Sequence, residues 1–170
     1  DKNRFELAAV DDTVLAKQDG FLSVTIPEDG EYTILVRESS YRGADNCRYR
    51  LHVGNFPRPS VAYPAGGKRG EQLKVQFIGD ASGPIEQPVT VSVDPKVPSD
   101  VFVSDAQGIT PSPVLFRAFS EGNVLEAEPN DGFENATRAE LPLAMNGRLE
   151  KPGDVDFFKE TVAAGPEAAQ

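Results

Sequence analysis

Apolar and polar residues alternate one by one along much of this chain, and long helical patterns are few. Leu22, Val24 and Ile26 alternate with polar residues, and the alternation resumes at Tyr32 and Ile34 after the turn-forming stretch PEDG. Because side chains of an extended strand point alternately to its two faces, this pattern predicts a β-hairpin with one buried face. Fifteen glycines and fourteen prolines punctuate the chain. The composition therefore indicates an all-β fold of short strands joined by turns.

A further alternating stretch, CRYRLHV, places Cys47, Tyr49, Leu51 and Val53 on one face of a strand. We therefore expect the Cys47 thiol to be buried and slow to react. As the only cysteine, it cannot form an intramolecular disulfide, and the usual Cys/His zinc cluster is excluded. His52, the only histidine, falls on the opposite face and cannot serve Cys47 as a base within this strand. We expect no enzymatic activity.

A proline-punctuated linker, residues 55–60, precedes a second strand-rich unit at residues 61–119. Two stretches of this unit alternate as the strands of a β-sandwich do. The apolar positions are Leu73, Val75 and Phe77 in one stretch and Val89, Val91 and Val93 in the other. The opening YPAGGKRGEQLKVQFIG resembles the immunoglobulin-like modules of the IPT/TIG type. Its PAGGKRG lacks the lysine followed by serine or threonine of a phosphate-binding loop, so we expect a turn there.

The stretch LEAEPNDGF at residues 125–133 carries oxygen donors at every second position. Pro129 disfavours a helix before it, and an extended backbone directs the donors to one side. A second acidic stretch, GDVDFF, follows at residues 153–158. Calcium binds roughly 6–8 oxygens from carboxylates, amides, carbonyls and water, which this set could supply. The candidate ligands are Glu126, Glu128, Asn130, Asp131, Asp154 and Asp156.

ExEPND followed by GDVDFF resembles the start of a bacterial pre-peptidase C-terminal (PPC) domain, a small calcium-binding β-sandwich related to the collagen-binding domains of bacterial collagenases. The resemblance implies that Glu126, Glu128, Asn130 and Asp131 are calcium ligands. Residues 120–170 then correspond to the first half of such a domain. PEDGEYTILVRESSYRG followed by YRLHVG, within residues 1–54, resembles its second half. The expected architecture is a tandem of β-sandwich modules in which both terminal modules are incomplete.

The net charge of −10 and the pI near 4.6 argue against a nucleic-acid partner. No apolar run approaches the roughly 18–20 residues of a membrane span, so we expect no membrane insertion. The expected function is that of a non-catalytic, calcium-stabilised accessory segment of a secreted or cell-surface multidomain bacterial protein. Its partners would be neighbouring domains of a longer parent chain. Two alternatives are an adhesive module that binds an extracellular protein fibre or glycan, and an accessory fragment of a secreted peptidase.

Half a sandwich leaves an apolar face and strand edges without partners. The two terminal segments could therefore dock on each other, which requires strand ladders between residues 21–53 and 148–162. The competing expectation is a folded middle module, residues 61–119, with two loosely ordered arms. Glu160 interrupts the alternation after Phe158. Either that strand ends at Lys159, or the glutamate lies at a sheet edge.

Overall fold

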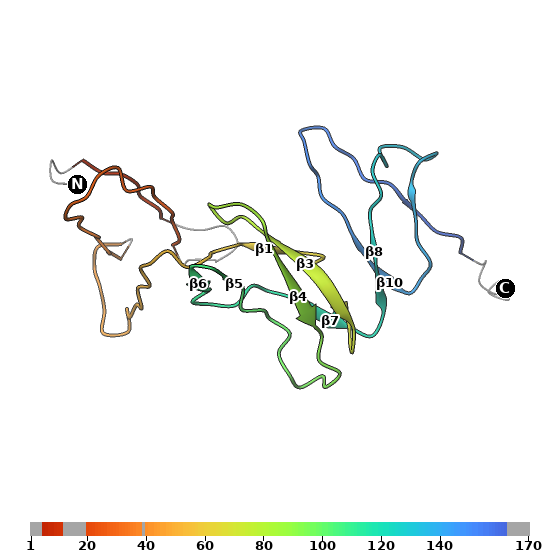
Figure 1. The fold of residues 1–170 in the computed structure, drawn as a ribbon, viewed down its shortest axis with the longest axis horizontal. Coiled ribbons are helices and arrows are strands. Elements are labelled where there is room, and N and C mark those ends of the chain that lie inside the picture. The colour runs from red at the N-terminus through yellow and green to blue at the C-terminus, as the bar shows by residue number, and fades with distance from the viewer. Residues whose placement is uncertain (1–4, 12–19, 39, 163–170) are drawn as a thin grey trace. The chain divides into compact units, whose positions relative to one another are not determined.

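The computed structural model describes residues 5–11, 20–38 and 40–162 (Figure 1). The fold is all-β: the described residues contain strands in several small sheets and no helix. Accordingly, no helix in this part of the chain could cross a membrane. Contacts divide the chain into two units, Asp1–Gly54 and Asn55–Gln170.

The described residues of the first unit form no strand, so the predicted hairpin is wrong. Most of its alternating apolar residues are exposed, including Leu22 and Ile26, although Tyr32 is half-buried. The prediction of a buried thiol also fails, because Cys47 is exposed. Alternation indicates which face a strand would bury, but burial requires a covering layer, and two strands without one are marginal in water. The described part of this unit supplies no such layer.

The described part of residues 21–53 contains no strand, so the ladders that docking of the two terminal segments requires lack one of their two strands.

The second unit begins with a three-stranded antiparallel sheet in the order β1-β3-β4 (Figure 1). Three shorter pairings complete this middle module: β2 with β7 in parallel, β5 with β6 as a hairpin, and an isolated bridge between Val101 and Val114. The strands are β1 (Val61–Tyr63), β2 (Gly66–Lys68), β3 (Gln72–Ile78), β4 (Ile85–Thr90), β5 (Ser104–Asp105), β6 (Gly108–Ile109) and β7 (Arg117–Phe119).

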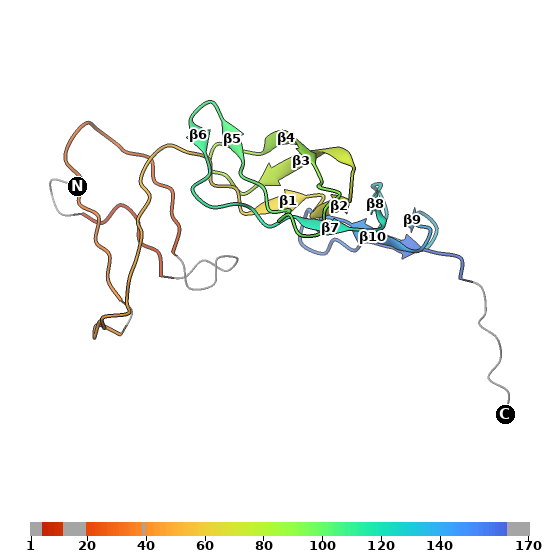
Figure 2. The ribbon, with the colours of Figure 1, turned by 90° about the horizontal axis from the view of Figure 1, so that it is seen from below.

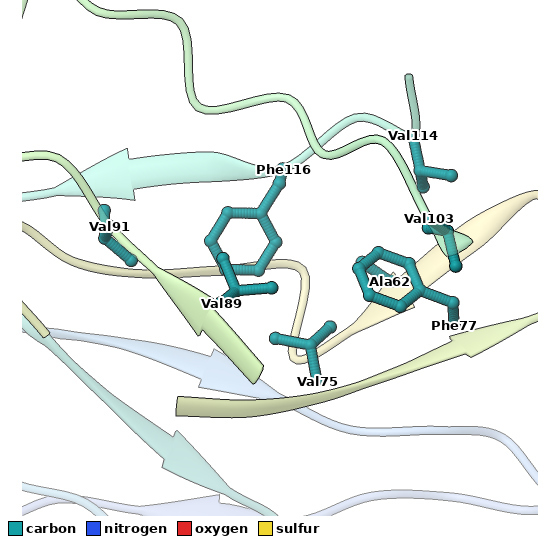
Figure 3. Packing of buried hydrophobic residues seen from close by; sticks show 8 residues of the cluster. All are labelled: Ala62, Val75, Phe77, Val89, Val91, Val103, Val114 and Phe116. Atoms are coloured by element: carbon teal, nitrogen blue, oxygen red, sulfur yellow. The ribbon is translucent and has the colours of Figure 1, made fainter. Parts of the chain in front are cut away.

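A small apolar core lies between this sheet and the segments that cover it (Figure 3). Val75 and Phe77 point inward from β3, and Val89 does so from β4, as the alternation predicts. Val91 is buried directly after β4, which ends at Thr90, whereas Val93 is 74% exposed. The core cluster consists of Ala62, Val75, Phe77, Val89, Val91, Val103, Val114 and Phe116.

The glycine-rich stretch PAGGKRG is not only a turn, as expected from the sequence. Gly66–Lys68 form β2, and the turn follows, with Gly70 at a φ of 83°. A side chain at Gly66 would collide with the carbonyl oxygen of Arg117 on β7 and would come within 2.6 Å of the Phe119 ring. Glycine is thus needed here for close strand approach as well as for turning.

Residues 55–60, expected to be a linker, pack against the middle module. The side chains of Pro57 and Pro59 are fully buried. The Arg58 N–H donates to Asp80 Oδ2 at 2.5 Å, and the Ser60 N–H donates to the Ile78 carbonyl at 2.8 Å. These bonds extend the edge of the module by a short, fixed segment.

The remaining strands form two parallel pairs, β8 with β10 and β9 with β11. Only Ser120 and Glu121 separate β7 from β8, and Figure 2 shows β7, β8 and β10 close together. The last strand ends at Lys159, so Glu160 lies just after the strand, as the first of the two expectations has it. The strands are β8 (Gly122–Leu125), β9 (Thr137–Arg138), β10 (Leu143–Asn146) and β11 (Phe158–Lys159). We call residues 120–162 the C-terminal segment.

Candidate metal centre

Three of the six candidate ligands come together in the C-terminal segment. Glu126, Glu128 and Asp156 each contribute a carboxylate oxygen, and these oxygens lie within 4.8 Å of one another. We call these three residues the acidic cluster. Glu126 and Asp156 are half-buried, and Glu128 is exposed. The cluster thus joins two stretches that are about thirty residues apart in the sequence.

The backbone fixes both sides of the acidic cluster. Glu126 directly follows β8, and its N–H donates to the Asn146 carbonyl at the end of β10, at 2.9 Å. Asp156 lies just before β11, where the Phe157 N–H donates to the Asn130 carbonyl at 3.0 Å. The ends of two parallel strand pairs therefore hold the carboxylates.

Within the described residues, several buried side-chain oxygens of this segment have no hydrogen-bond partner. They are Glu126 Oε2, Asp156 Oδ1, Asn130 Oδ1 and, further along, Glu160 Oε2. Asn130 is fully buried, and its amide nitrogen contacts Thr137 Oγ1 at 3.4 Å. Buried polar atoms usually have a protein or solvent partner, because desolvation without one is costly. These oxygens are thus available to a cation, a proton or water.

Electrostatics in the acidic cluster oppose full ionisation. The pKa of Glu126 is raised by burial, and further by the negative charges of Asp156 and Glu128, although the Arg148 N–H works in the other direction. The phenol of Tyr63, on β1 of the middle module, also has a raised pKa, first through burial and then through the negative charge of Glu126. Like charges this close destabilise one another unless a positive charge or a proton intervenes.

The other three candidate ligands, Asn130, Asp131 and Asp154, do not contribute a carboxylate to the acidic cluster. The Asn130 N–H donates to Glu128 Oε2 at 3.0 Å, so Asn130 adjoins the acidic cluster through its backbone. Asp131 is exposed and lies outside the cluster. The Asp154 side chain is 3% exposed, and its Oδ2 accepts the Glu150 N–H at 2.6 Å while Lys151 Nζ lies 4.0 Å from Oδ1. Asp154 therefore closes the turn before Asp156.

Three residues at the acidic cluster were not identified from the sequence: Gly147, Arg148 and Tyr63. A Cβ at Gly147 would lie 2.6 Å from both Asp156 Oδ2 and Glu126 Oε2, so the carboxylates rest directly on this glycine. The Arg148 N–H donates to Glu126 Oε1 at 2.7 Å. Tyr63 lies some sixty residues before Glu126. No local motif links these positions, so only the tertiary fold reveals them.

Comparison of the chain with protein-family models, with curated proteins and with solved structures finds no significant match. Carboxylate oxygens are typical ligands of hard cations, and calcium accepts irregular arrangements of them more readily than magnesium does. Thiolate and imidazole, which zinc prefers, do not occur in the acidic cluster.

Proposed function

We propose that this chain is a non-catalytic, calcium-stabilised structural segment of a secreted or cell-surface multidomain protein, of the PPC type in its C-terminal part. The observation that carries the proposal is the acidic cluster. Its carboxylate oxygens lie within 4.8 Å of one another, and Glu126 and Asp156 each have a buried oxygen without a partner. A divalent cation would neutralise this repulsion and satisfy these oxygens at once.

The residues that would hold calcium are Glu126 and Glu128 after β8 and Asp156 before β11, with Asn130 Oδ1 as the further buried oxygen. A cation bound by these residues would tie the end of one parallel strand pair to the start of the other. The two pairs are short, with four residues in β8 and two in β11. Such strands gain little stability from their own ladders. Calcium would thus serve as a cross-link that stabilises the fold of the C-terminal segment.

The proposal also includes an extracellular location for this segment. Extracellular modules bind calcium with dissociation constants of about 10⁻⁴–10⁻³ M. The expected partners are neighbouring domains of a longer parent chain, which a calcium-stabilised segment would hold apart at a defined spacing.

Calorimetric titration of the full chain with calcium, carried to millimolar concentration, tests the proposal. Wild-type protein should bind calcium, and Asp156→Asn should abolish the binding heat. Asp131→Asn is the informative companion: the family resemblance makes Asp131 a ligand, whereas the geometry leaves it outside the acidic cluster. We expect Asp131→Asn to retain binding. Absence of calcium heat in the wild type, or unchanged binding in Asp156→Asn, would refute the proposed site.

A further inference from the structure

The acidic cluster lies against the middle module as well as within the C-terminal segment. Tyr63 on β1 and Gln76 on β3 are paired across the antiparallel ladder. Arg148 contacts both of them: its guanidinium carbon lies 4.9 Å from the centre of the Tyr63 ring, and its Nη1 donates to Gln76 Oε1 at 3.2 Å. The same residue donates its backbone N–H to Glu126. Arg148 thus links the middle sheet to one of the carboxylates.

Two asparagines form a second set of contacts between the modules. Asn123 on β8 donates through Nδ2 to the Gly66 carbonyl at 2.7 Å, and its Oδ1 accepts from Asn146 Nδ2 at 3.0 Å. Asn146 on β10 accepts the Ala65 N–H through its Oδ1 at 3.1 Å. Both amides are half-buried, and each uses its oxygen and its nitrogen. This closed network fixes β8 and β10 against the backbone that leads into β2.

The tripeptide Asn146–Gly147–Arg148 connects these contacts with the acidic cluster. Asn146 is bonded to the middle module, Gly147 touches the carboxylates of Glu126 and Asp156, and Arg148 returns to the middle module. A shift of this tripeptide would move the surface on which two of the three carboxylates rest. The position of the middle module and the geometry of the acidic cluster therefore depend on the same three residues.

We infer that the acidic cluster is an inter-module site, in which cation binding is coupled to the packing of β1–β3 against β8 and β10, with Gln76 and Asn123 as positioning residues. The inference rests on the proposed function, because it needs a cation to bind. Coupling between two sites is reciprocal: if calcium strengthens the module contact, an intact module contact strengthens calcium binding by the same factor. Neither Gln76 nor Asn123 offers an oxygen to the cluster or carries a charge, so their effect on affinity would report coupling alone.

The first test compares calcium affinity in Gln76→Ala and Asn123→Ala, which we call the joint variants, with that in Gln87→Ala. Gln87 is a matched control: it is a neutral amide on β4 of the same sheet, and it bonds to the Phe102 carbonyl and the Ser104 N–H instead of to the C-terminal segment. We expect the two joint variants to bind calcium about 5-fold or more weakly, the lower end of typical coupling between sites. Gln87→Ala should bind as the wild type does.

The second measurement follows calcium binding through Tyr63, whose ring Arg148 contacts. The chain has no tryptophan, and Tyr63 is the only tyrosine in residues 55–170. Calcium should therefore perturb the near-ultraviolet tyrosine absorption of the wild type, and Tyr63→Phe should remove most of this difference spectrum. A purely structural contribution of Gln76 or Asn123 would not produce a calcium-dependent signal from Tyr63.

The outcomes separate the two proposals. If the wild type binds no calcium, the proposed function fails, and the inference fails with it. If the wild type binds calcium, but both joint variants match Gln87→Ala and the Tyr63 spectrum is unchanged, the inference is overturned while the calcium site stands. Weaker binding in the joint variants together with a calcium-dependent Tyr63 signal supports the inter-module site.

Discussion

Replacing Glu128 by glutamine should have opposite effects on stability with and without calcium. The substitution removes one negative charge but keeps an oxygen that can accept the Asn130 N–H, which lies 3.0 Å from Glu128 Oε2. Without a cation, the lost charge relieves repulsion with Glu126 and Asp156, so the variant should be more stable than the wild type. With calcium, the variant lacks a carboxylate ligand and should gain less stability from the ion.

The expected magnitudes follow from the geometry. Two like charges 4.8 Å apart repel each other by about 0.9 kcal/mol at the dielectric constant of water. That value applies because Glu128 is exposed, and Glu128 takes part in two of the three carboxylate pairs. Physiological salt screens the sum to about 1 kcal/mol. For a dissociation constant of about 10⁻⁴–10⁻³ M, calcium at about 10 mM adds about 1.4–2.7 kcal/mol to the wild type.

Urea unfolding followed by circular dichroism measures the stability of the variant in chelator and in calcium. Urea is uncharged, so the denaturant itself does not screen the repulsion between the carboxylates. In chelator, Glu128→Gln should unfold at higher urea than the wild type. Its stability gain from calcium should be below about 0.5 kcal/mol, since weaker binding reduces the mass-action term. Glu140→Gln is the control, because it removes the same charge from an exposed residue outside the acidic cluster. A variant that is less stable in chelator, or that gains as much from calcium as the wild type, would refute the electrostatic reasoning.

Three further outcomes are expected. In chelator, the free energy of unfolding should fall as pH rises through the folded-state pKa of Glu126, because burial first and then neighbouring charge raise that pKa above its ordinary value of 4.5. Glu126→Gln should flatten this part of a urea-midpoint profile, and a rise with pH that depends on Glu126 would contradict the assignment. Gly66→Ala should lower the melting temperature, since the added Cβ collides with the Arg117 carbonyl. Gly122→Ala should lower it little, because no atom lies within 4 Å of the added Cβ. Equal thermal shifts in the two variants would argue against the close approach of β2 and β7. Cys47 is exposed and should react with a thiol reagent about as fast in buffer as in urea, and strong protection in buffer would favour the buried strand that the sequence suggests.

The core of the middle module could be predicted from the sequence. Alternation at every second residue is a direct signature of a strand with one buried face, so it predicted which side chains point inward. The buried residues that it identified are Val75, Phe77, Val89 and Val91. The same signature misled at Leu22, Val24 and Ile26, which are exposed. Alternation records a preference for burial, but it carries no information on whether a covering layer is present.

The acidic cluster was half predictable. The two-residue spacing of Glu126 and Glu128, and the second acidic stretch at Asp156, identified the residues whose carboxylates lie together. The sequence could not separate them from Asp154, which accepts a backbone N–H within its own turn. Nor could it identify Tyr63, because a contact across sixty residues depends on how β1 packs against the C-terminal segment and leaves no local pattern.

The short connection between β7 and β8 has a mechanical consequence. β7 belongs to a sheet of the middle module and β8 to a sheet of the C-terminal segment, with only Ser120 and Glu121 between them. Two residues can extend by at most about 7 Å. Tension applied along the chain would pass from one sheet to the next with almost no slack, so the hydrogen bonds of β2–β7 and β8–β10 would bear load together. The pair of modules would resist stretching as one element, without a compliant spacer between them.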